Sequence, residues 1–129
     1  MKEYKIFLDD VRQPYDVFRT TILPIYENDS SWVIVRSYED FVEVLEKNGV
    51  PDVVSFDHDL SFDHYLEENQ KGDIDYNKMK EMTGYDAAKY LVEICIGKGV
   101  KLPMYYIHSA NPVGSENIKS YLENAKKYL

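Results

Sequence analysis

Residues 53–59 read VVSFDHD, a short apolar run that ends abruptly on polar, potentially reactive side chains. The same change recurs where residues 6–10 read IFLDD and residues 105–111 read YYIHSAN. Apolar runs of this length, separated by segments with helical periodicity, are typical of buried strands in a parallel sheet. The carboxyl ends of such strands line one crevice, where ligands usually bind. The sequence therefore predicts that residues far apart in the chain meet in one acidic, histidine-containing site.

Length and composition indicate a single globular domain spanning residues 1–129. Of the 129 residues, 44% are hydrophobic, which suits one compact unit with its own core. No apolar stretch is long enough to cross a bilayer, and no signal peptide is recognised before the first apolar run. Cys95 is the one cysteine and is expected to be a buried, inert thiol. We therefore expect a cytoplasmic protein without disulfides and without a membrane partner.

The net charge of −8 restricts the partners that the chain can have. Such a charge repels phosphate backbones at long range, so binding to duplex nucleic acid is not expected. A small phosphate-containing ligand or an RNA end would need local help from a metal ion, a helix N-terminus or a few placed cations. The sequence identifies no protein partner.

Start and stop signals divide the chain into alternating strands and helices. Strands are predicted at residues 5–8, 32–35, 53–56 and 104–107. Ser37 suits the N-cap position of a helix that ends at Gly49. Thr83 and Gly84 open a second helix, which ends at Gly97 and Gly99, and Asn111 precedes a final helix. Residues 11–25 are ambiguous, with a possible short helix between Pro14 and Pro24. Residues 61–82 form a polar insertion, with a possible helical turn at 65–69, which suits either a binding loop or a merely solvated segment.

This order of elements predicts an α/β fold, a three-layer sandwich around an open parallel sheet of about four strands. A strand order of 2-1-3-4, as in receiver and flavodoxin-like folds, places the switch point between the first and third strands. Asp9, Asp10 and Asp57 would meet there.

The acidic residues at this edge are candidate metal ligands, namely Asp9, Asp10, Asp57 and Asp59. Carboxylates gathered at strand ends repel one another unless something neutralises them. Mg²⁺, or Mn²⁺ in its place, prefers such oxygen ligands. Any one of these aspartates can instead cap the turn that follows its strand.

His58 and His108 are candidates for proton transfer, because imidazole titrates near neutral pH. Strand alternation would send His58 to the face opposite Asp57, and a turn directly after Asp57 would remove that obstacle. Either histidine can instead be a structural hydrogen-bond partner. The third histidine, His64, is expected at the surface of the polar insertion.

Three further residues are candidates for binding the substrate. Arg12 has a planar guanidinium that matches phosphate oxygens, although a surface salt bridge would also explain it. Ser109 and Asn111 lie where a strand passes into a helix N-terminus, which favours an anion. Asn111 before a proline equally suits a turn and a helix cap.

These residues resemble the receiver domains of two-component signalling. The paired acids Asp9 and Asp10, the third-strand Asp57 and the hydroxyl residue Ser109 match the receiver pattern. The resemblance implies that the acids bind Mg²⁺, that Asp57 accepts phosphate and that Ser109 senses it. Receivers also have a lysine after a fifth strand, whereas the elements predicted here end with the helix that follows the fourth.

A closer resemblance is to the cyclic-phosphate processing receiver domains. The hallmarks look like LDDVR at 8–12 with Pro14, FDHDL at 56–60, TGYD at 83–86 and HSANP at 108–112. The resemblance spans nearly the whole chain and implies processing of cyclic phosphates on nucleotides or RNA ends. The corresponding hypothesis is metal-assisted phosphoester hydrolysis, with Asp57, His58 and His108 as catalytic residues. The alternative is a non-catalytic receiver-like signalling module that docks a partner protein and can be phosphorylated on Asp57.

Overall fold

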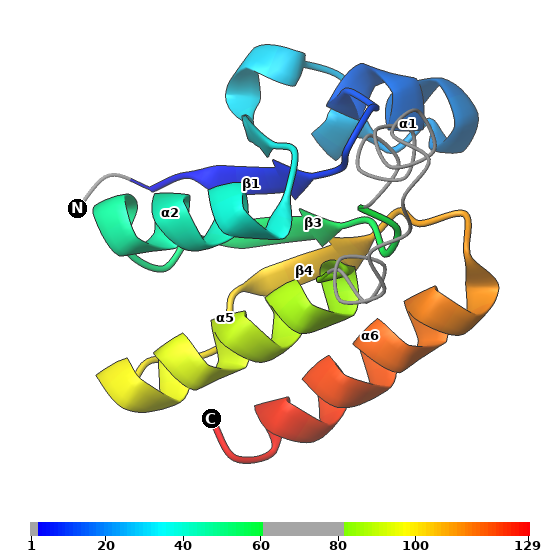
Figure 1. Ribbon diagram of the computed structural model, residues 1–129. Coiled ribbons are helices and arrows are strands. Elements are labelled where there is room, and N and C mark those ends of the chain that lie inside the picture. Colours follow the sequence, from blue (N-terminus) through cyan, green and yellow to red (C-terminus); the bar gives the residue numbers. More distant parts are fainter. Residues whose placement is uncertain (1–2, 61–81) are drawn as a thin grey trace, which may run out of the picture.

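The computed structural model describes residues 3–60 and 82–129, and its centre is a parallel sheet (Figure 1). The strands are β1 (Lys5–Leu8), β2 (Val33–Val35), β3 (Val53–Phe56) and β4 (Met104–Ile107). They lie in the order β2-β1-β3-β4, and every neighbouring pair is parallel. The predicted fold class and strand order are therefore confirmed.

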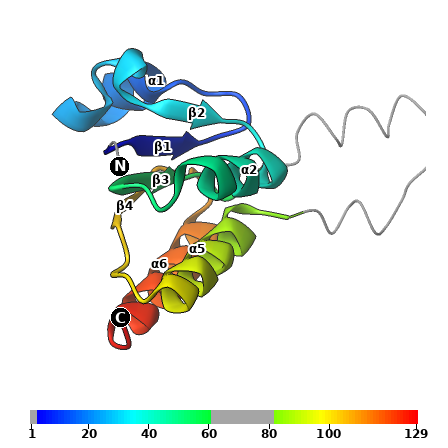
Figure 2. The same cartoon turned by 90° about the vertical axis from the view of Figure 1, so that its left-hand side faces the viewer.

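Helices cover both faces of this sheet and complete the three layers (Figure 2). One face carries α2 (Tyr38–Asn48), α5 (Gly84–Lys98) and α6 (Pro112–Lys126). The other face carries α1 (Pro14–Thr21), followed by two short 3-10 turns, Pro24–Tyr26 and Asp29–Ser31. The ambiguous residues 11–25 thus fold as α1 and the beginning of the first turn.

The helices begin and end at the residues that the sequence indicates. The Ser37 side chain accepts a hydrogen bond from a first-turn backbone N–H of α2, and Thr83 and Asn111 do the same for α5 and α6. Gly49 and Gly99 follow α2 and α5 with φ of 83° and 66°, a left-handed conformation that favours glycine.

Strand alternation separates the side chains into two cores, one on each face of the sheet. The larger core lies under α2, α5 and α6 and includes Ile6, Leu8, Val54, Phe56, Phe41, Leu91, Ile118 and Leu122. Cys95 belongs to this core, and burial raises the pKa of its thiol, as expected for an inert cysteine. The smaller core lies under α1 and consists of Phe7, Val17, Tyr26 and Trp32. This smaller, aromatic core borders the candidate site.

The predicted helical turn at 65–69 and the surface position of His64 lie outside the described residues. Within residues 3–60 and 82–129, no helix combines the length and the apolar character that crossing a bilayer requires.

Candidate functional site

The strand register brings three of the predicted residues into one row. The last residues of β1, β3 and β4 pair with one another, and the next residue in each strand's direction is Asp9, Asp57 or His108. Side chains alternate along a strand, so these three share the face of the sheet that α1 covers. Arg36 stands in the same row after β2, because the last residue of β2 pairs with the last residue of β1.

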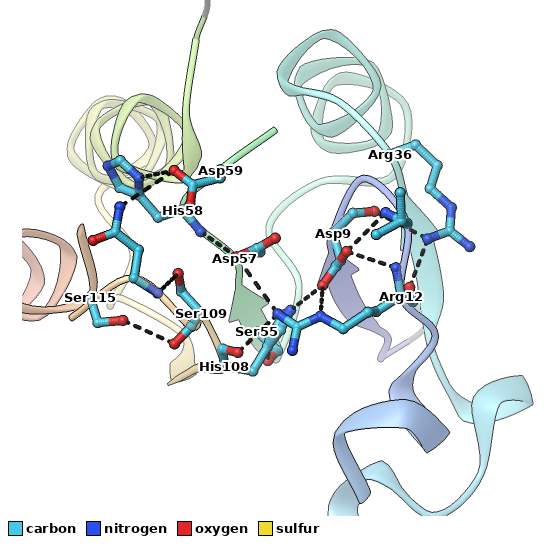
Figure 3. Close-up of polar contacts among 12 residues, drawn as sticks. Asp9, Arg12, Arg36, Ser55, Asp57, His58, Asp59, His108, Ser109 and Ser115 are labelled. Atoms are coloured by element: carbon cyan, nitrogen blue, oxygen red, sulfur yellow. Dashed lines mark hydrogen bonds and ion pairs between the residues drawn. The ribbon is translucent and has the colours of Figure 1, made fainter. Parts of the chain in front are cut away.

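Asp9 is a fully hydrogen-bonded carboxylate (Figure 3). Its Oδ1 accepts from the backbone N–H groups of Val11 and Arg12, at 2.9 and 2.8 Å. Its Oδ2 accepts from Nε of Arg12 at 2.8 Å and lies 3.1 Å from Nε2 of His108. Two oxygens offer about four acceptor positions, so the bonds of Asp9 occupy all of them.

These bonds determine the charge state of Asp9. Burial alone would raise its pKa, because the side chain is completely buried. The hydrogen bond from His108, the backbone donors and the Arg12 charge outweigh burial and hold the pKa of Asp9 well below its usual range. Asp9 is therefore a permanent negative charge at the edge of the sheet.

His108 lies behind Asp9, and its side chain is only 1% exposed. The imidazole stacks on the Phe7 ring, with centroids 4.3 Å apart and planes 8° from parallel. Its Nδ1 lies 2.6 Å from Oγ of Ser55, and its Nε2 faces Asp9. Burial lowers the pKa of His108, although the contact with Asp9 opposes this effect. The structure thus brings His108 to the site but gives its ring no route to a ligand except through Asp9.

Asp57 experiences the opposite electrostatic environment. Burial and the neighbouring charge of Asp9 raise the pKa of Asp57 to about 6. Arg12, the backbone N–H of His58 and the nearby Ser109 hydroxyl act in the other direction without cancelling that rise. The Nη2 atom of Arg12 is 3.7 Å from Oδ1 of Asp57, too long for a hydrogen bond. The ionised form of Asp57 is therefore under-neutralised.

Three carboxylates gather at this point and could hold a metal ion. Asp9, Asp10 and Asp57 each offer an oxygen, and these oxygens lie within 4.8 Å of one another. Asp59, which the sequence also suggested as a ligand, does not belong to this group among the described residues. Its side chain is 68% exposed and contacts Nδ1 of His58 at 2.9 Å.

His58 follows strand alternation, and the expected turn does not bring its ring to the Asp57 side. Figure 3 shows the ring directed toward Asp59 and away from the Asp57 carboxylate. On that side the ring packs on Gly114 of α6, where an added Cβ would lie 2.3 Å from Cγ of His58. The ring is held by this packing, and its Nε2 has no partner among residues 3–60 and 82–129.

A second glycine fixes the backbone that carries Asp57. Gly84, the first residue of α5, donates its N–H to the carbonyl of His58 at 2.8 Å. A Cβ at this position would lie 1.8 Å from the carbonyl oxygen of Asp57. The start of α5 can approach the end of β3 this closely only because residue 84 has no side chain.

Two arginines hold the loop between β1 and α1. Besides its bond to Asp9, Arg12 donates from Nη2 to the carbonyl of His108 at 3.1 Å, and its side chain is 33% exposed. Arg36 donates from Nη1 to the carbonyls of Asp9 and Arg12, at 3.2 and 2.7 Å. Arg12 is thus a fixed cation between Asp9 and Asp57 with part of its surface open to a ligand.

The loop after β4 contains the remaining candidates. The Ser109 hydroxyl oxygen accepts from the backbone N–H of Asn111 at 3.1 Å, and the hydroxyl lowers the pKa of Asp57, which places it near that carboxylate. The Asn111 side chain accepts from the N–H of Gly114 at 2.9 Å and donates to Asp59 at 3.4 Å. Capping α6 therefore accounts for Asn111, whose role in substrate binding stays a prediction.

A model of the cyclic-phosphate processing receiver domain matches residues 4–124, which include all four strands and nearly all of α6. The chain belongs to this family. The resemblance predicted from the four sequence blocks is thereby confirmed. No curated protein matches the chain.

In this receiver domain, three residues of the site were not recognised from the sequence. One sequence signal could have identified Arg36, namely its position directly after a strand that neighbours β1. Ser55 is a polar residue inside an otherwise apolar strand, and it is completely buried. Tyr26 directly follows residues 11–25, the segment whose structure was ambiguous. Its hydroxyl is 2.6 Å from Oγ of Ser55, a contact between distant segments that no local pattern encodes.

Proposed function

We propose that this domain is a metal-dependent phosphoesterase that opens cyclic phosphates of nucleotides or RNA ends. The observation that carries the proposal is the cluster of Asp9, Asp10 and Asp57, with oxygens within 4.8 Å of one another and the Arg12 guanidinium beside it. Membership in a cyclic-phosphate processing family supports the substrate class.

The donor set fits a hard divalent cation, because carboxylate oxygens are the ligands that Mg²⁺ and Mn²⁺ prefer. Asp10 and Asp57 would bind the ion directly, with Asp9 beside them, and the raised pKa of Asp57, about 6, indicates a carboxylate that gains from a nearby positive charge. When bound, such an ion would polarise a phosphoryl oxygen and offset negative charge in the transition state. Since the oxygens of Asp9 already accept four hydrogen bonds, Asp9 mainly supplies charge and orientation.

Opening a cyclic phosphate requires two proton movements. A P–O bond to a water oxygen forms while the P–O bond to one ribose oxygen breaks, so the water loses a proton and the ribose oxygen gains one. His58, with its partly exposed ring, is the proposed proton-transfer group, because Asp57 would be a ligand of the ion. The His58 ring would have to turn from Asp59 toward Asp57 to reach the phosphate. Arg12 and Ser109 would hold the other phosphate oxygens. His108 would act through Asp9.

The test measures turnover of 2′,3′-cyclic nucleotides with Mg²⁺ and after chelation. We expect activity only with the metal, and a loss of at least about 100-fold in Asp57→Asn and in His58→Ala. Glu46→Gln, an exposed change on α2, is the matched control and should keep full activity. Turnover that survives both chelation and Asp57→Asn would contradict the proposal.

A second candidate function is phosphorylation of Asp57 in a non-catalytic module. Two observations favour it, namely the Ser109 hydroxyl near Asp57 and the histidine rings, of which His108 is buried and His58 is turned aside. Incubation with a small phosphodonor and Mg²⁺ should then give stable labelling, without turnover of cyclic nucleotides. Labelling that persists in Asp57→Asn would rule this function out.

A further inference from the structure

We infer that Tyr26 and Ser55 are positioning residues that act through His108 to hold Asp9 and Arg12 in their working arrangement. This inference deepens the proposed function and rests on it for its activity measurement. Neither residue touches the acidic cluster itself.

One continuous buried row of hydrogen bonds joins four side chains, those of Tyr26, Ser55, His108 and Asp9. The Tyr26 hydroxyl is 2.6 Å from Oγ of Ser55, and Oγ of Ser55 is 2.6 Å from Nδ1 of His108. On the other side of the ring, Nε2 of His108 is 3.1 Å from Oδ2 of Asp9. Relative exposure is 1% for Tyr26 and 0% for Ser55 and Asp9. Water therefore has no access through which it could replace a missing member.

The chemistry of the groups sets the direction of each bond. The ionised Asp9 carboxylate only accepts, so Nε2 of His108 must carry a hydrogen. In a neutral ring Nδ1 then has a lone pair and accepts from the Ser55 hydroxyl. Ser55 has one hydrogen, and this bond uses it, so the Tyr26 hydroxyl must donate to Ser55. The row thus selects one imidazole tautomer, the one whose hydrogen points at Asp9.

Ser55 also provides the space that this arrangement needs. On the sheet, Ser55 of β3 lies between Phe7 of β1 and Tyr106 of β4. Its small side chain lets the His108 ring cross β3, stack on Phe7 and reach Asp9. A valine, as at position 54 of the same strand, would supply neither the hydroxyl nor the room.

The effect reaches the cluster through Arg12. Oδ2 of Asp9 accepts from both His108 and Nε of Arg12, so the ring and the guanidinium share one oxygen. The same guanidinium lies 3.7 Å from Oδ1 of Asp57. A ring that no longer donates to Asp9 would leave the carboxylate and Arg12 free to rotate away from Asp57.

The experiment compares Ser55→Ala and Tyr26→Phe with the wild type, and Tyr106→Phe is the matched control. Tyr106 packs edge-to-face on Tyr26, with centroids 6.0 Å apart, but its hydroxyl points to the sulfur of Met104 and not into the row. The first readout is the ¹⁵N NMR spectrum of the His108 ring and the exchange of its Nε2 hydrogen with water. The second is kcat and KM for the cyclic nucleotide, with thermal unfolding to verify that each variant is folded.

We expect the wild type and Tyr106→Phe to show the Nε2–H tautomer. In Ser55→Ala the Nδ1 signal should shift, and the Nε2 hydrogen should exchange with water roughly tenfold faster, since one buried hydrogen bond is lost. The kcat of this variant should fall by a similar factor. Tyr26→Phe should show the same changes with smaller size. Identical ring spectra in all four folded proteins would overturn the inference, as would turnover that is unchanged in Ser55→Ala. If the wild type shows no turnover but the ring spectra of Ser55→Ala and Tyr26→Phe change as expected, the hydrolase proposal is refuted and the positioning row is supported.

Discussion

Asp9 and Asp57 follow neighbouring strands and face the same side of the sheet, yet their surroundings are opposite in kind. Around Asp9 the chain supplies four hydrogen-bond donors, and the pKa of Asp9 is held well below its usual range. Around Asp57 burial and the Asp9 charge raise the pKa to about 6. One carboxylate is stabilised in its charged form, and the other is destabilised in it.

This contrast shows how the site divides its tasks. The Asp9 half, with Arg12 and His108, is a complete network that a ligand cannot improve. The Asp57 half rests on two close contacts, of Gly84 with the Asp57 backbone and of Gly114 with the His58 ring, and holds a charge that the protein neutralises only in part. A cation or a proton therefore gains most at Asp57, which makes Asp57 the centre of both proposed functions.

The largest expected effect tests the packing beneath Asp57. In Gly84→Ala the new Cβ would lie 1.8 Å from the Asp57 carbonyl oxygen, so the start of α5 must move away from β3. We expect a loss of about 3 kcal/mol or more in the free energy of unfolding, measured by urea denaturation. Gly97→Ala in the same helix is the control, because nothing lies within 4 Å of its added Cβ. That variant should be as stable as the wild type or gain about 0.5–1 kcal/mol.

Removing the charge of Asp9 should be nearly as harmful. In Asp9→Asn an NH₂ group replaces one of two oxygens that each accept two hydrogen bonds, and buried donors lose their partner. We expect a loss of about 2–4 kcal/mol at pH 7 in the same measurement. Glu46→Gln on the exposed side of α2 should change stability by less than about 0.5 kcal/mol. An Asp9→Asn protein of wild-type stability would mean that the network around Asp9 carries no net energy.

The same substitution at Asp57 should raise the free energy of unfolding near neutral pH, where Asp9→Asn lowers it. The folded pKa of about 6 exceeds the ordinary 3.8, so the folded protein binds more protons between pH 4 and 6. Wild-type stability should therefore fall as pH rises through this window. The stability of Asp57→Asn should not show this fall, because the variant has no carboxyl group at residue 57. We expect the free energy of unfolding of Asp57→Asn, relative to the wild type, to rise by about 2–3 kcal/mol between pH 4 and 7. Urea denaturation at each pH measures this difference. A difference that does not change with pH would show that Asp57 is not destabilised in its ionised form.

The row of Asp9, Asp57 and His108 could be predicted because it depends on two local properties. Apolar runs locate the strands, and parallel strands end at a common edge, so the residues that follow the runs must meet. The caps of α2, α5 and α6 were predictable for the same reason, since a cap is a property of a few adjacent residues.

Strand alternation gave the direction of the His58 ring, but the sequence could not exclude a turn that would reverse it, because distant residues decide between the two. Alternation directs the ring toward α6, and Gly114 leaves the space that the ring fills. The sequence allowed a turn after Asp57, and nothing near residue 58 excludes one. Ser55 and Tyr26 were missed for a related reason, because their importance arises from a hydrogen bond between separate elements. Local patterns thus identify which residues end strands but not which neighbours they acquire.

The smallest expected effect is the stabilisation by a metal ion that would neutralise the charge of Asp57. At pH 7.5 and Mg²⁺ at tenfold its Kd, binding to the folded state adds about 1.4 kcal/mol of stability, a rise of a few degrees in Tm. Asp57→Asn should lose this rise, because it removes an oxygen of the cluster and the charge that attracts the ion. Asp59→Asn is the matched control, since Asp59 is exposed and outside the cluster, and it should keep the full rise. An equal Mg²⁺ response in Asp57→Asn, or a response lost in Asp59→Asn, would place the ion elsewhere and remove the contrast between Asp9 and Asp57 as the basis of the site.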